Sequence, residues 1–309
     1  MERDARDLKC LEDLCLADPR RDKARIEQTG GGLLQDSYRW VLDLPVFEQW
    51  RQDQGSRLLW IHGGPGSGKT ILLCGIVDEL EKSTASPPLS FFFCQASDAR
   101  ASDATTVLRG LIYLLVSQQP VLISHVQKKY EKVGQSIFED AYSWTTLSGI
   151  FINILQDSAM QGAYIIVDAL DECVTNMPQL LNLIVDKSTV APNVKWLVSS
   201  RKWRRIEDHL GTASLAVELG REASAEPVAI AVRAYTSHRI QELSERKGYD
   251  ENTMNAVRDH ISSNDKATFL WTASMEDFYG KYWNLVRRIS AGRFLPPPLS
   301  RVGLSRRKS

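Results

Sequence analysis

The sequence predicts a three-layer α/β domain with a five-stranded, mainly parallel sheet, followed by a partial all-α unit. Five short runs rich in Ile, Val, Leu and aromatic residues are apolar almost without interruption, a pattern typical of strands buried on both faces of a parallel sheet. Segments of helical length and pattern separate most of these runs, which indicates crossover connections. After residue 220 the strand pattern stops and helical patterns continue.

The elements follow one another in a regular order. The expected strands are residues 57–62, 89–94, 163–168, 194–200 and 214–219. The expected helices between them are residues 70–83, 104–119, 144–159 and 177–190. The segment 95–162 is too long for a single crossover, so we expect it to contain two or three helices.

The flanking regions differ from this central α/β region, which we place at residues 51–222. Residues 1–50 are expected to form a helical or irregular segment that leads into it. Helical patterns at 226–248 and 250–264 predict a partial helical subdomain over residues 223–280. Residues 281–309 are basic and contain the run PPP, which predicts a mobile tail. Its last residues, SRRKS, could be a localisation signal or a nucleic-acid contact, although a short solvated basic end is the commoner case.

Composition argues against several classes of partner. The chain has 309 residues, 43% of them hydrophobic, and equal numbers of basic and acidic residues (38 each). Zero net charge gives no general attraction to nucleic acid or anionic membranes, so neither partner is expected. The charged N-terminus lacks the apolar core of a signal peptide, and no run approaches the ~20 apolar residues of a membrane span. We therefore expect a cytoplasmic protein, with the nucleus as the alternative, and reduced, buried cysteines.

A glycine-rich turn, IHGGPGSGKT at residues 61–70, joins the first expected strand to the first expected helix. Gly63, Gly68, Lys69 and Thr70 match the spacing G-x-x-x-x-G-K-[ST] of a phosphate-binding loop. Glycines allow backbone N–H groups to curl inward around phosphate oxygens, and the following helix directs its positive dipole end to the same place. The predicted phosphate-binding residues are Gly63, Gly64, Pro65, Gly66, Ser67, Gly68, Lys69, Thr70 and Ile71.

The loop motif predicts roles for two of its own side chains and requires a second strand that ends in an acidic residue. Lys69 can reach the β- and γ-phosphates, and the Thr70 hydroxyl can ligate Mg²⁺. Asp168, at the end of the apolar run AYIIVD, is the second predicted Mg²⁺ ligand. Asp171 and Glu172 follow closely, and a carboxylate there can polarise a water for attack on the γ-phosphate. Either of the two can be this base, with a slight preference for Glu172.

Two alternatives stay open at these strand ends. Asp171 and Glu172 could instead cap the helix that begins near Met177. The strand VKWLVSS is followed by Arg201, which would lie beside the γ-phosphate, and report its presence, if that strand lies between the phosphate-loop strand and the Asp168 strand. Otherwise Arg201 is a solvated arginine at a strand end. His62, just before the loop, is interpreted as a strand-end residue, with a ligand role as the alternative.

With these residues in place, the chain resembles the NACHT family of signal-transducing P-loop NTPases (the STAND class), particularly its fungal NOD-like and heterokaryon-incompatibility branch. The segments LLWIHGGPGSGKTILLCGIVDEL, YIIVDALDEC and KWLVSSR carry the resemblance, which extends over roughly residues 11–272. It implies a switch that is inactive with ADP, opens on exchange for ATP, and hydrolyses ATP slowly. It also implies self-association or contact with other signalling proteins.

The same resemblance implies that GGGLLQDSY (residues 30–38) lies against the nucleotide. Gly31 and Gly32 would allow the protein backbone to approach the nucleotide closely, and Leu33 or Leu34 would pack on the purine. A flexible linker turn is the alternative. After about residue 272 the helical and winged-helix continuation of the family is not identifiable, so we expect a truncated gene product, a gene model in error at an exon boundary, or a standalone fragment. Both ATP and GTP fit the motifs.

An incomplete lid motivates a second hypothesis, a nucleotide-binding interaction module without useful turnover, because an open, wet site is less preorganised for reaction. A small-molecule P-loop kinase is a third. It would need an arginine-rich closing lid, and the run after Arg201 matches that only in part.

Overall fold

The computed structural model describes residues 2–29, 32–82, 87–140, 142–190, 193–219, 225–247 and 251. The chain divides into two compact units, residues 1–232 and 233–309. Of the second unit, only residues 233–247 and residue 251 are described. The predicted helix at 250–264, apart from residue 251, and the predicted basic tail therefore lie outside the described residues.

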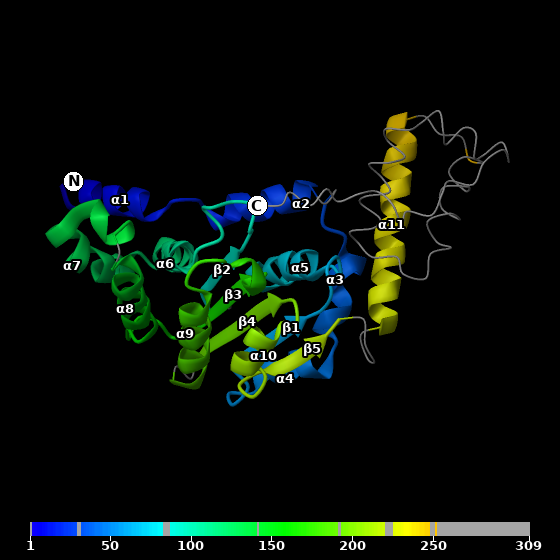
Figure 1. The fold of residues 1–309 in the computed structure, drawn as a ribbon. Helices are drawn as coiled ribbons and strands as arrows, with labels where there is room; N and C mark the ends of the chain where they lie inside the picture. The colour runs from blue at the N-terminus through cyan, green and yellow to red at the C-terminus, as the bar shows by residue number, and fades with distance from the viewer. Residues whose placement is uncertain are drawn as a thin grey trace, which may run out of the picture. The chain divides into compact units, whose positions relative to one another are not determined.

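A parallel five-stranded sheet forms the centre of the first unit (Figure 1). Its strands are β1 (Leu58–His62), β2 (Leu89–Phe93), β3 (Ala163–Asp168), β4 (Val194–Ser200) and β5 (Leu215–Glu218). Their order is β2-β3-β4-β1-β5, and every neighbouring pair is parallel. The predicted α/β class and its five strands are confirmed, with strand ends within one residue. Strand β4 lies between β1 and β3, which is the arrangement that the role predicted for Arg201 requires.

Helices precede and connect the strands. The helices before β1 are α1 (Glu2–Leu14), α2 (Pro19–Thr29), α3 (Gln35–Leu42) and α4 (Pro45–Gln52). Helix α5 (Lys69–Glu81) follows β1, and α6 (Ala104–Gln118), α7 (Ile123–Val133) and α8 (Ser143–Leu155) fill the long connection between β2 and β3 as expected. The last described helices are α9 (Met177–Val190), α10 (Arg204–Leu210) and α11 (Ala225–Lys247).

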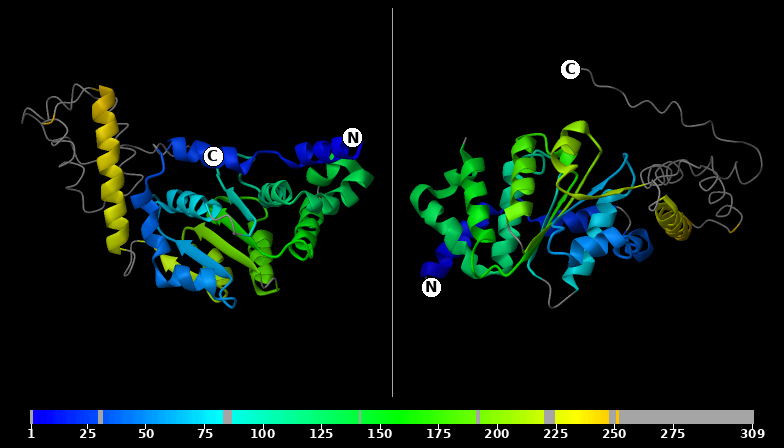
Figure 2. Two further views of the ribbon diagram at one scale, coloured as in Figure 1. Left: turned by 180° about the vertical axis from the view of Figure 1, so that it is seen from behind. Right: turned by 90° about the horizontal axis from the view of Figure 1, so that it is seen from below.

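The sheet is buried on both faces, which explains its continuous apolar runs. Trp196 and Val198 of β4 belong to a core shared with α6, α8 and α9. Leu197, between them in the sequence, belongs to a second core shared with α3, α4 and α5. Successive strand side chains point to opposite faces, so each face needs its own apolar layer. In the right-hand view of Figure 2, the lighter blue and cyan helices α3, α4 and α5 lie on one side of the sheet, and the green helices lie on the other together with the dark blue α1.

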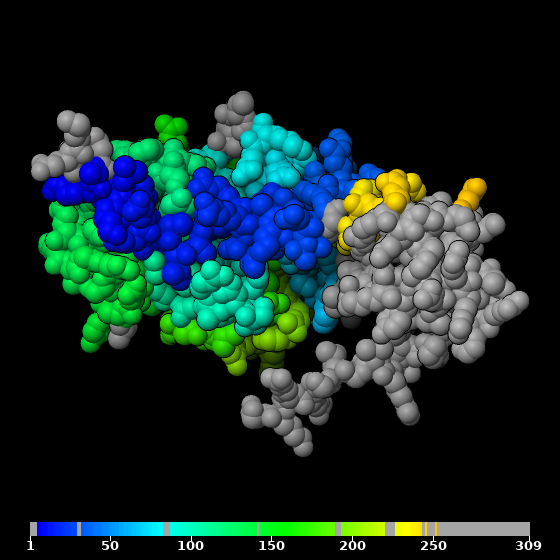
Figure 3. Space-filling model, turned by 90° about the horizontal axis from the view of Figure 1, so that it is seen from above, coloured from blue at the N-terminus to red at the C-terminus, as the bar shows by residue number. Residues whose placement is uncertain are grey.

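The N-terminal helix α1 is anchored by a buried arginine of α6. Arg109 is 6% exposed, and its Nε and Nη2 donate to the carbonyl oxygens of Leu14 (3.0 Å) and Asp13 (2.7 Å). These carbonyls end α1 and have no partner within the helix, and a cation there also complements the helix dipole. Figure 3 shows α1 alongside the green residues of α7, which it contacts. Residues 2–14 thus pack onto the α/β region.

Helix α5 is held by the two helices that precede it in sequence. The Tyr38 ring of α3 lies against Gly75, where an added Cβ would be 2.1 Å from the nearest ring atom, and its hydroxyl donates to Glu79 (2.8 Å). Lys23 of α2, 8% exposed, forms an ion pair with Asp78 of α5. The helix that begins at the glycine-rich loop is therefore fixed from its outer side by α2 and α3.

Candidate functional site

The glycine-rich loop connects β1 to α5, and its backbone explains most of its glycines. Gly66 (φ 72°) and Gly68 (φ 85°) adopt left-handed conformations, which glycine tolerates without steric cost. Gly68 directly precedes α5, so the unpaired amides of the first helical turn open toward the loop. A Cβ on Gly63 would lie 2.9 Å from Ser67 Oγ and 3.1 Å from Leu219 Cβ, whereas one on Gly64 would meet nothing within 4 Å. The loop has the form of an anion-binding nest.

Lys69 is the first residue of α5, and its ammonium group lies over the loop. Its Nζ donates to the carbonyl oxygens of Gly63 (2.9 Å) and Gly64 (3.0 Å) and to Ser67 Oγ (3.3 Å). Burial lowers the pKa of Lys69, and the charges of nearby carboxylates oppose this shift. The charged groups that act on it are Asp168, Asp171, Arg201 and Glu172, all of them residues that the sequence predicts for this site.

Asp168 ends β3 and is 2% exposed. Burial raises the pKa of its carboxyl group, while hydrogen bonds from Ser199 and Thr70, and the charge of Lys69, act in the opposite direction. The Thr70 hydroxyl and the Asp168 carboxylate, distant in sequence, are thus close enough for the hydroxyl to act on the carboxyl group. A hydroxyl and a carboxylate are oxygen ligands of the kind that Mg²⁺ prefers, so this pair fits the predicted metal.

Asp171 lies just beyond β3, and its side chain is 3% exposed. Its Oδ1 accepts a hydrogen bond from the backbone N–H of Arg201 (2.9 Å), and its Oδ2 accepts one from Arg201 Nε (2.6 Å). The sequence places both residues in the site but does not indicate that they pair. Arg201 also stacks on Trp203, with its guanidinium carbon 5.3 Å from the ring centre.

Glu172 is the more accessible of the two acidic residues, with a side chain 35% exposed. Its Oε2 accepts a hydrogen bond from the backbone N–H of Ala96 (3.0 Å), and its Oε1 lies 3.9 Å from Arg201 Nη2. Helix α9 begins only at Met177. Because Asp171 and Glu172 bond to Arg201 and Ala96 instead, the alternative that they cap this helix is wrong.

Two contributors to the site were not assigned a role from the sequence. Ser199 is fully buried; its hydroxyl donates to Asp168 Oδ1 and accepts from the backbone N–H of Ala169 (3.0 Å). Ala169 has a left-handed backbone (φ 52°), so this hydrogen bond supports a strained turn directly after the predicted metal ligand. A polar serine ending an apolar strand is a signal for such a role. Ala96 contributes only its amide, for which the sequence holds no signal.

His62 is the last residue of β1, which confirms its position at a strand end. It is 4% exposed, its ring centre lies 4.3 Å from that of Trp60, and its Nδ1 has no hydrogen-bond partner among the described residues. Burial lowers its pKa. The neutral form is therefore favoured in the folded protein.

The lowered pKa of His62 predicts that the stability of the protein depends on pH. An unfolded histidine takes up a proton as the pH falls through about 6.5, whereas folded His62 does so only at lower pH. The unfolded state then binds more protons, so the free energy of unfolding should fall as the pH is lowered from 7.5 to 5.5. Urea denaturation across this range should show a shallower decline for His62→Phe than for the wild type. Identical slopes would contradict the assigned neutral state.

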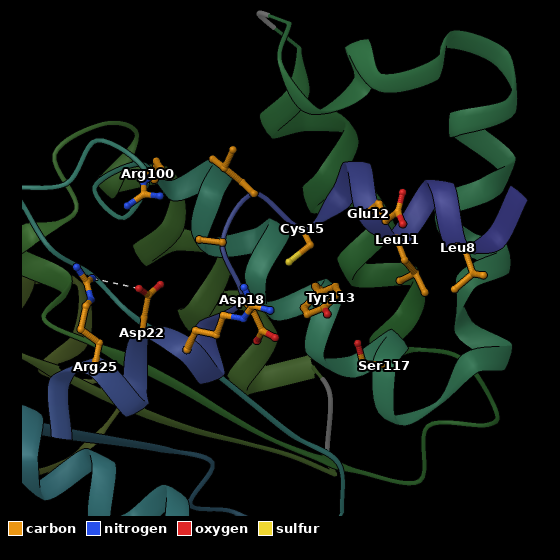
Figure 4. Close-up of a pocket in the computed structure, with 13 residues that line it drawn as sticks. Leu8, Leu11, Glu12, Cys15, Asp18, Asp22, Arg25, Arg100, Tyr113 and Ser117 are labelled. Carbon is orange, nitrogen blue, oxygen red and sulfur yellow. Dashed lines mark hydrogen bonds and ion pairs between the residues drawn. The ribbon is translucent and has the colours of Figure 1, made fainter. Parts of the chain in front are cut away.

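A hollow of about 720 Å³ lies between α1, α2 and α6 (Figure 4). Leu8 and Leu11 of α1 and Tyr113 of α6 are among its lining residues. Its charged groups include Arg25, which bonds to Asp22 at 3.1 Å. None of the predicted nucleotide-binding residues lines it, so the candidate site is the loop and the adjoining strand ends, not this hollow.

Comparison with known proteins gives matches in both sequence and fold. Residues 36–201 match the family model described as nephrocystin 3, N-terminal. The chain is 52% identical over 272 residues to the vegetative incompatibility protein HET-E-1 of Podospora anserina, covering 88% of this chain and 20% of that protein. It thus spans about a fifth of that relative's length.

Solved structures also resemble it. One is a Walker-type ATPase of Pyrococcus abyssi, with 12% identity, coverage of 84% of this chain and 70% of that chain, and a TM-score of 0.45. Another is domain III of the replication initiation protein DnaA of Thermotoga maritima, with 12% identity, coverage of 85% and 93%, and a TM-score of 0.39.

The sequence matches bear directly on the predicted family. The family model spans the glycine-rich loop, Asp168 and Arg201 in one continuous match. Together with the similarity to HET-E-1, it confirms the predicted relationship to fungal NACHT proteins of the incompatibility type. Because the matched residues make up more than half of the chain, the chain belongs to the nephrocystin 3 N-terminal family.

Proposed function

We propose that this chain is a nucleotide-dependent signalling switch that binds ATP or GTP with Mg²⁺ and hydrolyses it slowly. The observation that carries the proposal is a loop with left-handed glycines, covered by the Lys69 ammonium, with Thr70 close to the buried carboxyl group of Asp168. This arrangement combines a phosphate nest with two oxygen ligands for a cation.

Each group has a distinct task in this proposal. The backbone N–H groups of the loop after Pro65, and those of the first turn of α5, bind phosphate oxygens. Lys69 exchanges its loop carbonyl partners for oxygens of the β- and γ-phosphates, and Thr70 and Asp168 hold the metal. When bound, Mg²⁺ supplies charge neutralisation between these phosphates. Ser199 keeps Asp168 in place through its buried hydrogen bond.

Glu172 is suited to orient the attacking water. Its Oε2 is fixed by the Ala96 amide, and among the described residues its Oε1 has only Arg201 as a charged neighbour, at 3.9 Å. A carboxylate held by one oxygen and open at the other can accept a hydrogen bond from a water. Slow turnover is consistent with a site in which a single carboxylate, fixed by one backbone amide, orients the water.

The switch role is inferred by analogy with relatives of this chain. The described part of the chain contains no helix with the length and apolar character that a membrane crossing needs. The relative HET-E-1 is a vegetative incompatibility protein. By analogy, ADP and ATP would favour different arrangements of a core at residues 51–222 and a helical lid at 223–280. Self-association and other signalling proteins are the partners that this role needs, in the cytoplasm or nucleus.

A nucleotide-binding interaction module without useful turnover is the second candidate. This candidate is favoured because both carboxylates that could act as the base are already hydrogen-bonded. Asp171 is bonded to Arg201 through both oxygens, and Glu172 is bonded to Ala96 through one. Binding would then stabilise a surface without consuming nucleotide.

Thermal unfolding with Mg²⁺ and ATP, ADP, GTP or GDP tests the binding. A ligand present at about 100 times its Kd should add about 2.7 kcal/mol to the free energy of unfolding, a Tm increase of about 5–10 °C for a unit of this size. No shift with any of the four nucleotides would refute both candidates. Single-turnover phosphate release then separates them, since release no faster than in Lys69→Ala would leave only the interaction module.

A further inference from the structure

The two acidic residues after β3 differ in what they contact, and this difference divides their roles. We propose that Asp171 is a positioning residue, which fixes Arg201 so that its guanidinium can recognise the γ-phosphate, and that Asp171 is not the base. The inference rests on the proposed function, since it assigns tasks within the same nucleotide site.

Both carboxylate oxygens of Asp171 are already hydrogen-bonded to Arg201. Its Oδ1 and Oδ2 accept hydrogen bonds from the backbone N–H and the Nε of Arg201. With a side chain only 3% exposed, it is also shielded from solvent. A base must reach the proton that it accepts within hydrogen-bond distance. The accessibility and bonding of Asp171 suit a structural partner better than a base.

The same two bonds determine where Arg201 points. They hold the residue at its backbone and at Nε, and Trp203 packs against the guanidinium at 5.3 Å. The two terminal nitrogens make no hydrogen bond to the described residues, and the side chain is 40% exposed. An arginine held at Nε presents its outer N–H groups as a fork, a geometry suited to phosphate oxygens.

The end of β4 also brings Arg201 next to the loop that Lys69 covers. His62 of β1 pairs with Ser200 of β4, and the backbone N–H of Gly63 donates to the carbonyl oxygen of Ser200 (3.4 Å), so Arg201 follows directly after the contact between β4 and the loop. Lys69 lies over the loop carbonyls, whereas Arg201 approaches from the end of β4. Two cations that approach from different elements, a helix and a strand end, can hold a terminal phosphate from two sides, and a diphosphate would lose the Arg201 contact.

The test compares ATP and ADP affinities, measured by calorimetry with Mg²⁺, in five variants of the full chain. Asp171→Asn and Arg201→Gln should each reduce the preference for ATP over ADP about tenfold, and the double variant should lose no more than either single variant. Glu172→Gln should keep the preference within about twofold while losing phosphate release. Lys202→Gln removes a positive charge next to Arg201 and serves as the control, expected to leave the preference unchanged.

Several results would overturn the inference. Asp171→Asn that keeps the ATP preference but loses phosphate release would make Asp171 the base. Additive losses in the double variant would show that Asp171 does not act through Arg201. If Asp171→Asn does not fold, Glu172→Gln decides: wild-type phosphate release would leave Asp171 as the base, and its loss supports the proposal. Wild-type protein that binds neither nucleotide would instead refute the proposed function, and this inference with it.

Discussion

Replacing Lys69 by alanine is expected to weaken the binding of ATP with Mg²⁺ at least about 100-fold. The Lys69 ammonium lies over the loop, 2.9–3.3 Å from three of its oxygens, where phosphate oxygens would be received. A hydrogen bond to a charged group contributes about 1.5–3 kcal/mol, and loss of two to phosphate therefore corresponds to at least that factor in Kd. Calorimetric titration of the variant and the wild type measures it directly.

Two controls accompany this prediction. Lys82→Ala removes a lysine just after the same helix, with a side chain 58% exposed and paired with Glu79, and should bind as the wild type does. Because Lys69→Ala also leaves loop oxygens without a donor, its unfolding midpoint without nucleotide should be compared with that of Lys69→Arg. Undiminished ATP affinity in a folded Lys69→Ala protein would place the phosphates somewhere other than this loop.

Gly75→Ala is expected to destabilise the protein by about 3 kcal/mol, at the upper end of the range for an overpacked core. The new methyl group would lie 2.1–2.5 Å from three ring carbons of Tyr38, a side chain that is itself 2% exposed and hydrogen-bonded through its hydroxyl to Glu79. Neither α3 nor the ring can move without breaking other contacts. Urea denaturation followed by circular dichroism measures the change.

The matched control lies in another helix of the same unit. Gly149 in α8 has nothing within 4 Å of an added Cβ, so Gly149→Ala should stabilise by about 0.5–1 kcal/mol through helix propensity alone. The Gly75→Ala defect should shrink when Tyr38 is replaced by leucine, because the colliding ring is gone. Equal effects of alanine at both glycines would show that Tyr38 does not pack against α5 as described.

The sheet could be predicted from the sequence because its strands are buried on both faces. Residues 163–168 and 194–200 match the observed β3 and β4 at both ends, since in each case the apolar run stops where the backbone leaves the sheet. The phosphate loop is equally local: its glycines, Lys69 and Thr70 are contiguous. Strand order was needed to place Arg201 at the end of the strand next to that of Asp168, and no single segment contains that order.

The contacts that escaped prediction join residues far apart in the chain. The sequence around Arg109 does not indicate that this arginine bonds to the end of α1. The sequence around Gly75 likewise does not indicate that the Tyr38 ring packs against this glycine. The Arg201–Asp171 pair has the same character: each residue was expected in the site, but their bond depends on the turn after β3. The segment at 30–38 stays a prediction; Gly32 has a left-handed backbone (φ 89°), and Gly31 lies outside the described residues.

The packing of α2 and α3 on α5 decides how the nucleotide-binding part can be isolated. A recombinant fragment starting at residue 51 would lack Tyr38, Val41, Phe47 and Trp50, all buried in the same apolar layer as α5. It would also leave Asp78 without its lysine partner. Bare apolar surface of this kind promotes aggregation, so a soluble preparation for ligand studies should begin upstream of Pro19.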